Sequence, residues 1–218
     1  MQSEKFLAKF NRNERVIFLS DGVFAIVLTL LALELRVPEF HEKVTNGTLW
    51  NAIRQMGPHF LSFLLSFMFI ASLWFTHDQV FRLFDKVDNV ILWLNNLLLL
   101  MICFIPFPTA VLGRYPNTGV GITMLGTIWV ITPTLVYLMA RRAYNKKYLH
   151  ETVDLERFKM LSKVSLMFAP LSAIPLTFSW NYPKVALIYY MMRVLLSTFL
   201  AFMVRVKQTE AESQPGAL

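Results

Sequence analysis

The chain alternates long apolar runs with short polar segments. Six of these runs approach the ~20 apolar residues that a helix needs to cross a hydrocarbon core ~30 Å thick. We therefore predict membrane helices near residues 16–36, 58–81, 89–112, 119–140, 160–180 and 184–205. The long connection after the first run also favours a short surface helix near residues 49–55. The pattern predicts an all-α membrane protein with six transmembrane helices per subunit.

Composition agrees with a membrane protein. Hydrophobic residues make up 56% of the chain and charged residues 16%, against roughly 25% charged residues in soluble domains. The first apolar run lacks a small-residue cleavage site, which favours a retained span over a signal peptide. We expect residues 1–206 to form a single six-helix transmembrane domain, and the polar residues 207–218 to form a disordered cytoplasmic tail.

The basic residues predict the orientation of the spans. The N-terminal segment carries four Lys and Arg, the second loop two, the fourth loop seven and the tail two, whereas the opposite side carries five in all. Cytoplasmic loops retain an excess of these residues, so both termini should be cytoplasmic. The net charge of +7 is then explained by topology, and we expect no nucleic-acid partner.

A layer of polar side chains interrupts the first three spans. At ~1.5 Å of rise per residue, these residues lie at similar depths, about 6–10 Å from the cytoplasmic ends of their helices. A carboxylate at this depth should point into the bundle and find hydrogen-bond donors. The layer is either a set of interhelical hydrogen bonds or an ion-binding or proton-relay site, and we favour the first for Asp21 and the asparagines. Its members are Ser20, Asp21, Trp74, His77, Asn95 and Asn96.

Three motifs resemble a known family. Arg15-x-x-x-Leu19-Ser20-Asp21 resembles the RxxxFSD signature of the endosomal and lysosomal potassium channel family, the transmembrane protein 175 family. The segment WFTHDQVF at 74–81 is similar to the second helix of that family, and WLNNLLLLMICFIPF at 93–107 to its third. The chain departs from the signature in having Leu19 where the family has Phe.

The resemblance implies a channel in a prokaryotic cell membrane. Its subunits would have six helices and assemble as a homotetramer among membrane lipids, with the first helix lining a central pore. Members of the family conduct potassium in preference to sodium without a TVGYG filter, through a constriction of large aliphatic side chains. Carried over by position, the constriction comprises Ile26, Leu30 and Leu33, and Arg15 has a structural role at the helix start. Potassium would be the permeant ion, with no fixed metal ligands and no cofactor.

The spacing of Ile26, Leu30 and Leu33 places the three side chains on one face of a helix. Taken alone, such a stripe is more typical of a lipid-facing or packed surface than of a pore. Thr29 either faces the pore or bonds back to its own helix, and we favour the second. Glu34 is a candidate for a ring of carboxylates at the outer mouth, while the glutamates at 39 and 42 are more typical of a solvated loop.

Other functions remain open at this point. The sequence has no hydrolase or zinc-protease motif, so we do not expect an enzyme. A proton-coupled secondary transporter using Asp21 and His77 is the main alternative, although no inverted repeat supports it. A membrane scaffold without transport is a third possibility. Arg193 lies near the middle of the last predicted span, where arginines are rare and usually paired, and the sequence does not identify its partner.

Overall fold

The computed structural model describes residues 12–40, 43–151, 153 and 155–197. Within these ranges the chain is helical apart from loops and one β-bridge between Phe84 and Leu149. The predicted tail at 207–218 and the end of the last predicted span lie outside the described residues. The helices are α2 (Arg12–Ala32), α3 (Asn46–Gln55), α4 (Gly57–Phe81), α5 (Asn89–Phe104), α6 (Pro106–Arg114), α7 (Gly119–Lys146), α8 (Leu155–Ala173) and the 3-10 turn η1 (Ile174–Thr177), followed by helical residues 183–197.

Four segments of the described chain are long and apolar enough to cross a membrane. They are Arg12–Ala32, Gly57–Phe81, Asn89–Arg114 and Gly119–Lys146, and they confirm the first four predicted spans. Asn89–Arg114 comprises α5 and α6, which meet at Ile105, where Pro106 begins the second helix. A proline tolerates this first helical position because its missing N–H would have no intrahelical partner there.

The last two predicted spans have a more limited basis in the structure. The region 160–180 is occupied by most of α8 and by η1, and the region 184–205 begins with helical residues 183–197. Neither meets the length and hydropathy criteria that the first four segments meet within the described residues. The structure thus supports an all-helical membrane protein with four candidate spans, and the count of six stays a prediction.

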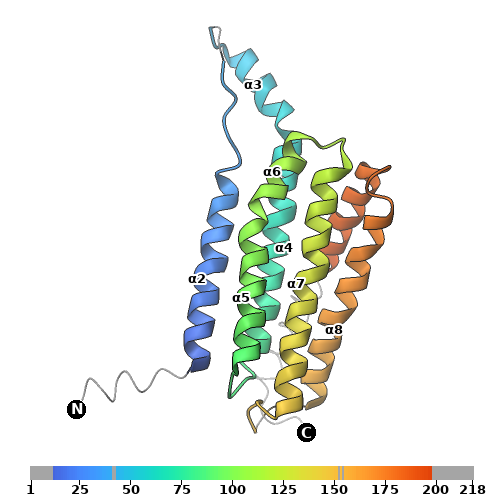
Figure 1. Cartoon of the computed structure of the whole chain (residues 1–218). Coiled ribbons are helices and arrows are strands. Elements are labelled where there is room, and N and C mark those ends of the chain that lie inside the picture. The colour runs from blue at the N-terminus through green and yellow to red at the C-terminus, as the bar shows by residue number, and fades with distance from the viewer. Residues whose placement is uncertain (1–11, 41–42, 152, 154, 198–218) are drawn as a thin grey trace, which may run out of the picture.

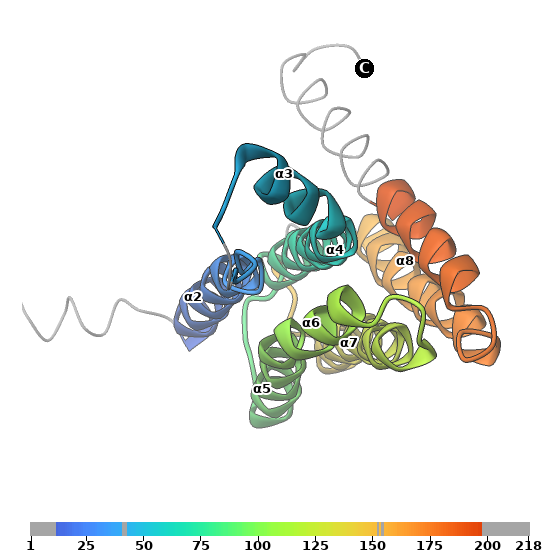
Figure 2. The ribbon, with the colours of Figure 1, turned by 90° about the horizontal axis from the view of Figure 1, so that it is seen from above.

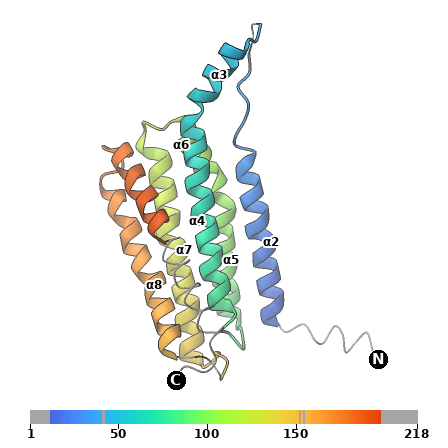
Figure 3. The same ribbon diagram turned by 180° about the vertical axis from the view of Figure 1, so that it is seen from behind.

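The predicted surface helix is present as α3, and it begins three residues before the expected position. Thr45 caps it, since its side chain accepts a hydrogen bond from the Thr48 amide while the Thr48 hydroxyl accepts one from the Thr45 amide. This reciprocal arrangement satisfies backbone groups that a helix start leaves free. Figures 1 and 3 show α3 beyond the end of the bundle, between α2 and α4 along the chain.

α7 lies inside the bundle and α2 lies at its edge. In the most apolar 18-residue stretch of α7, 56% of the residues are buried, against 28% in that of α2. Viewed from above, α2 packs beside α4 and α5, with its other side turned away from the remaining helices (Figure 2). Gly126 allows the close approach of the last helix to α7, because a Cβ at this position would overlap the Tyr190 hydroxyl.

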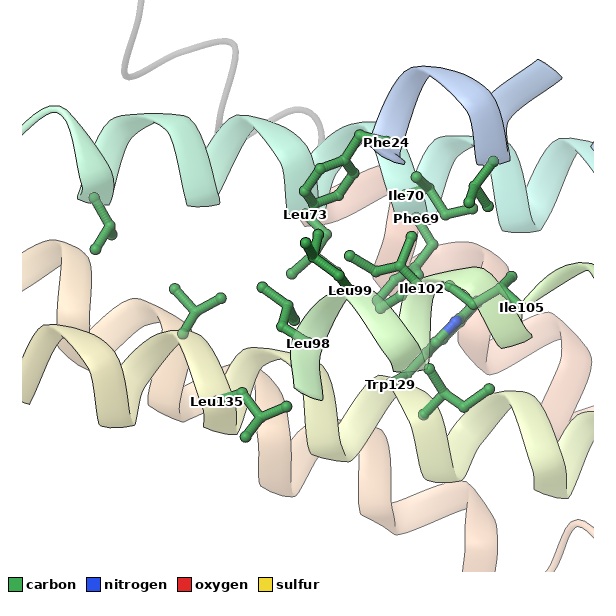
Figure 4. Packing of buried hydrophobic residues seen from close by; sticks show 14 of the residues in the cluster. Phe24, Phe69, Ile70, Leu73, Leu98, Leu99, Ile102, Ile105, Trp129 and Leu135 are labelled. Atoms are coloured by element: carbon green, nitrogen blue, oxygen red, sulfur yellow. The ribbon is translucent and has the colours of Figure 1, made fainter. Parts of the chain in front are cut away.

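The hydrophobic core joins α2, α4, α5 and α7. Figure 4 shows Phe24 of α2 beside α4, with Leu99 and Ile102 of α5 facing them. Phe69 of α4 stacks on Trp129 of α7, with ring centroids 4.4 Å apart. α2 therefore contributes one face to the core, and the function of its other face has to be sought at the surface.

Candidate functional site

Buried positions recur every three or four residues along the inward face of α2. Its small or apolar side chains are at most 2% exposed, and they pack against α4 and α5. This period is that of an α-helix with one face against a core. The buried residues are Ser20, Phe24, Val27 and Leu31.

The outward face of α2 carries the predicted constriction. Ile26 is 58% exposed and Leu30 43%, and Leu33, in the turn directly after α2, is 67% exposed. Leu19 and Gly22 continue this exposed stripe toward the start of the helix. The structure therefore places the three aliphatic residues together on a surface that the rest of the described chain leaves exposed.

The two polar candidates at the stripe differ in their environment. The Thr29 hydroxyl donates a hydrogen bond to the Ile26 carbonyl over 2.7 Å. This is the backbone contact that we favoured from the sequence. Glu34 lies two residues beyond the end of α2 and is half-buried. The glutamate at 39 is exposed in the following loop, and the one at 42 lies outside the described residues.

Ser20, Asn95 and His77 form a continuous polar cluster across three helices. The Asn95 amide nitrogen donates to the Ser20 hydroxyl over 3.0 Å, and the Ser20 hydroxyl donates to the Val16 carbonyl over 2.8 Å. His77 Nε2 lies 2.9 Å from Asn95 Oδ1. Because that oxygen can only accept, the assigned tautomer of His77 carries its proton on Nε2. All three side chains are at most 1% exposed.

The cluster is closed on the His77 side by aromatic rings. The imidazole stacks on Phe81 with centroids 4.2 Å apart, and Phe24 lies 5.6 Å away. Asp21 makes a separate contact, because its Oδ1 accepts a 2.8 Å hydrogen bond from Trp74 Nε1. α2 is thus held to its neighbours at two adjacent positions, Ser20 and Asp21.

Two residues with predicted structural roles, Asn96 of the polar layer and Arg15 at the helix start, lie apart from this cluster. Asn96 is exposed on α5, one position from Asn95, and Arg15 is exposed near the start of α2. Neither belongs to the chain of hydrogen bonds that links Ser20, Asn95 and His77 in the described part of the molecule. Successive helical positions face different directions, so a shared depth was not enough to identify the members.

A second set of contacts, which the sequence pattern did not predict, joins α2, α5 and α7 near the loop after α4. The Asn13 side chain donates to the Phe84 carbonyl over 2.7 Å. Asp88 caps α5 by accepting from the Ile91 amide, and it forms a 2.8 Å ion pair with Arg142 of α7. The aspartate immediately before an apolar helix is an N-cap signal that could have been recognised.

The environment of Asp88 favours its charged form. Burial by itself raises the pKa of this carboxyl, but hydrogen bonds from the Ile91 amide and from Arg142 outweigh that effect and lower the pKa below its ordinary value. Each of these bonds strengthens when the acceptor is ionised. Asp88 therefore stabilises the loop end of the bundle as a carboxylate.

Arg193 is enclosed by aromatic rings. It is 8% exposed, and its guanidinium carbon lies 5.8 Å from the ring centroids of Phe69 and Trp129 and 5.2 Å from that of Phe168. Its Nη2 also donates to the Phe168 carbonyl over 3.3 Å. Aromatic faces attract cations. The partners of Arg193, which the sequence did not identify, are therefore these three rings.

Comparison with known proteins shows which family these features resemble. Residues 15–106, which include most of α2, all of α4 and α5 and the whole polar cluster, match the sequence profile described as "Endosomal/lysosomal potassium channel TMEM175". The fold matches the crystal structure of a lysosomal potassium-selective channel TMEM175 homolog from Chamaesiphon minutus with a TM-score of 0.77 and 26% identity, over 87% of this chain and 97% of that one. Over residues 15–106 the chain is therefore similar to the TMEM175 family. The matching profile and the relatives described next are named as ion channels.

Individual TMEM175 relatives differ in how much of the chain they match. A potassium channel of Chamaesiphon minutus is 42% identical over 101 residues, which are 46% of this chain and 49% of the relative. A potassium channel of Streptomyces collinus is 39% identical over 105 residues, 48% of this chain and 50% of the relative. The chain thus spans about half the length of these curated relatives. A potassium channel of a Chryseobacterium strain is 29% identical over 81% of this chain and 88% of its own length.

Within the residues that the structure describes, no group of three or more His, Cys, Asp or Glu could hold a metal ion. The candidate site consists of an apolar stripe on one side of α2 and a polar cluster that fixes α2 on the other.

Proposed function

We propose that this protein is a channel that conducts potassium in preference to sodium. Its pore would lie on the axis of a homotetramer, lined by the exposed face of α2 from each subunit. The observation that carries the proposal is the stripe of Ile26, Leu30 and Leu33, which is exposed while the opposite face of the same helix is buried. Relatives that match a little under half of the chain are named potassium channels.

Selectivity would arise at an apolar constriction. The chain contains no TVGYG segment, so rings of backbone carbonyls of that kind are not available. Four isoleucine side chains at the level of Ile26 would force a cation to lose much of its hydration shell, and potassium releases water more readily than sodium. Apolar constrictions can also gate a pore by losing their water. Leu30 and Leu33 would extend the apolar level toward the outer end.

The polar candidates would have secondary roles. Because the Thr29 hydroxyl already bonds to the Ile26 carbonyl, we assign it to the helix backbone and not to the ion path. Glu34 would contribute to a ring of carboxylates at the mouth, where negative charge concentrates cations. Ser20, Asp21, Trp74, His77 and Asn95 would hold α2 in the rotation that presents its stripe to the pore.

A proton-coupled secondary transporter that uses Asp21 and His77 is the second candidate. A vertebrate relative named for proton movement, the endosomal/lysosomal proton channel TMEM175 of Gallus gallus, is 28% identical over 89% of this chain and 38% of the relative. That name supports movement of protons, but it describes a channel and not a transporter. Against the transporter, His77 is enclosed by Phe24 and Phe81 and bonded to Asn95. Asp21 bonds to Trp74 instead, in a contact separate from the cluster of Ser20, Asn95 and His77.

Flux measurements on the purified full chain in liposomes separate these functions. A channel gives passive potassium flux that follows the imposed voltage and exceeds sodium flux. A proton-coupled transporter gives saturable potassium or proton movement that depends on the pH gradient, and a scaffold gives neither. Mass photometry of the same preparation tests the homotetramer, and absence of a tetramer together with absence of flux would contradict the proposed pore.

A further inference from the structure

A groove lies at the end of the bundle where α4 begins and α6 ends. It has a volume of about 350 Å³, within the range of sites that bind small molecules. It lies between α4, α6, the loop before α7 and the start of the helix at 183–197. The lining includes Pro58, Leu61, Leu112, Leu187, Asn117 and Lys184.

The charge of the groove is one-sided. Among the described residues that line it, Lys184 is the only ionisable one. It lies at the start of the helix that begins at residue 183. A helix N-terminus carries partial positive charge, which adds to that of the ammonium group. An apolar cleft with a cation at its rim is complementary to a molecule with an aliphatic chain and an anionic head.

The surroundings of the groove indicate the depth at which it lies in the membrane. Tyr115, Trp180 and Tyr182 are exposed at this end of the bundle, in the loop after α6 and between η1 and the last helix. Exposed tyrosine and tryptophan gather at the level of lipid headgroups, where their apolar rings and polar tips suit both environments. The rim with Lys184 is two residues from Tyr182 and would lie at this level.

From these observations we infer that the groove binds an anionic glycerophospholipid. One acyl chain lies along Pro58, Leu61, Leu112 and Leu187, and the phosphate lies against the Lys184 ammonium group with the Asn117 amide beside it. The lipid joins α4 and α6 to the last helix. Binding does not depend on ion conduction, so the two proposals can fail separately.

Native mass spectrometry of the full chain in neutral detergent tests the lipid site. The probes are dioleoylphosphatidylglycerol and dioleoylphosphatidylcholine, which share acyl chains and differ in net charge. The wild-type protein should retain phosphatidylglycerol at several-fold lower concentration than phosphatidylcholine. Lys184→Gln should remove most of that preference. Lys86→Gln should keep it, because Lys86 lies in the loop between α4 and α5, at the opposite end of α4 from the groove.

A second variant tests the acyl chain. Leu61→Trp fills the groove and should weaken binding of both lipids several-fold, and Leu187→Phe should do so more mildly if the first variant fails to fold. If Lys184→Gln kept the same lipid preference, the retained lipid would be non-specific lipid around the protein, and that result would overturn the proposal. So would loss of the oligomer without loss of lipid in Leu61→Trp, which would mean that a neighbouring subunit fills the groove. Thermal stabilisation by glycerol phosphate equal to that by the lipid would also overturn it.

Discussion

The Trp74 indole donates a 2.8 Å hydrogen bond to the Asp21 carboxylate and so joins α4 to α2. The adjacent residue Ser20 joins α2 to α5 through Asn95. Two consecutive residues therefore tie the edge helix to two different neighbours. Together they fix the rotation of α2 about its axis, and with it the direction in which Ile26 faces.

Removing the carboxylate should weaken assembly more than selectivity. Asp21→Ala leaves the Trp74 N–H without its acceptor, and interhelical hydrogen bonds in membranes contribute roughly 0.6–2 kcal/mol. We expect a smaller yield of intact oligomer in mild detergent, measured by size-exclusion chromatography, with the potassium preference of the remaining oligomer retained. His77→Ala should have the same kind of effect.

Trp74→Phe is the matched test of the same contact from the other helix. It removes the indole N–H and keeps an aromatic ring, so it should reproduce part of the Asp21→Ala effect. An Asp21→Ala protein that assembles normally but conducts no ions would contradict the structural role and favour an ion-binding carboxylate.

Asn95 and Asn96 provide a matched pair for the polar cluster. Asn95→Ala removes the acceptor of His77 and the donor to Ser20, both fully buried. Buried polar groups left without partners cost about 1–3 kcal/mol. Asn96 is exposed, so Asn96→Ala should change stability by less than about 0.5 kcal/mol. Thermal unfolding followed by intrinsic fluorescence would distinguish them, and equal effects would contradict the cluster as described.

Asp88 should make the stability of the bundle depend on pH. Its pKa is lowered in the folded protein, so its stabilisation is fully present above its unfolded value, about pH 4, and is lost as the pH falls through the folded pKa. Asp88→Asn should lower stability at neutral pH by removing the Arg142 ion pair. It should also flatten the loss of stability below pH 4.

The ion pair can be isolated by a double-mutant cycle. Arg142→Gln should have a smaller effect in the Asp88→Asn background than in the wild type, because the pair is then already broken. Additive losses, or a wild-type pH profile in Asp88→Asn, would show that another carboxylate is responsible.

Hydropathy predicted the first four spans because span length depends on membrane thickness and not on packing detail. The exposed stripe on α2 also followed from residue spacing. By contrast, the depth in the membrane expected from the sequence is nearly the same for Asn95 and Asn96. Only the packing of α5 against α2 and α4 shows that Asn95 is the residue that bonds to Ser20 and His77. The aromatic partners of Arg193 come from α4, α7 and α8, and no local pattern connects such distant positions.

Cysteine labelling in intact cells tests the orientation that the basic residues predict. In a Cys103→Ser background, cysteines at Thr45 or Asn117 should react with an impermeant thiol reagent added outside, and one at Asn145 should not. All three positions are exposed, so accessibility within the fold does not limit the reaction. The reverse pattern would place both termini outside and would move Glu34 to the cytoplasmic mouth.

The side chain of Ile26 should control both the amount and the selectivity of cation flux. It lies on the exposed stripe of α2, five residues beyond Asp21, where the family resemblance places the constriction. A ring of polar side chains at this position would lower the free energy needed for a hydrated cation to pass the narrowest level of the pore. Ile26→Asn should therefore raise total cation flux and reduce the preference for potassium, measured by conductance and reversal potential under opposed potassium and sodium gradients.

Leu195→Asn is the matched control for this change. Leu195 is 59% exposed, close to the 58% of Ile26, but it lies on the last helix, away from α2 (Figure 2). The substitution carries the same polar change at an exposed membrane position and should leave conductance and selectivity unchanged. If both variants form tetramers and Ile26→Asn also leaves flux and reversal potential unchanged, Ile26 does not line the pore, and the stripe on α2 is a surface for lipid or for a neighbouring subunit.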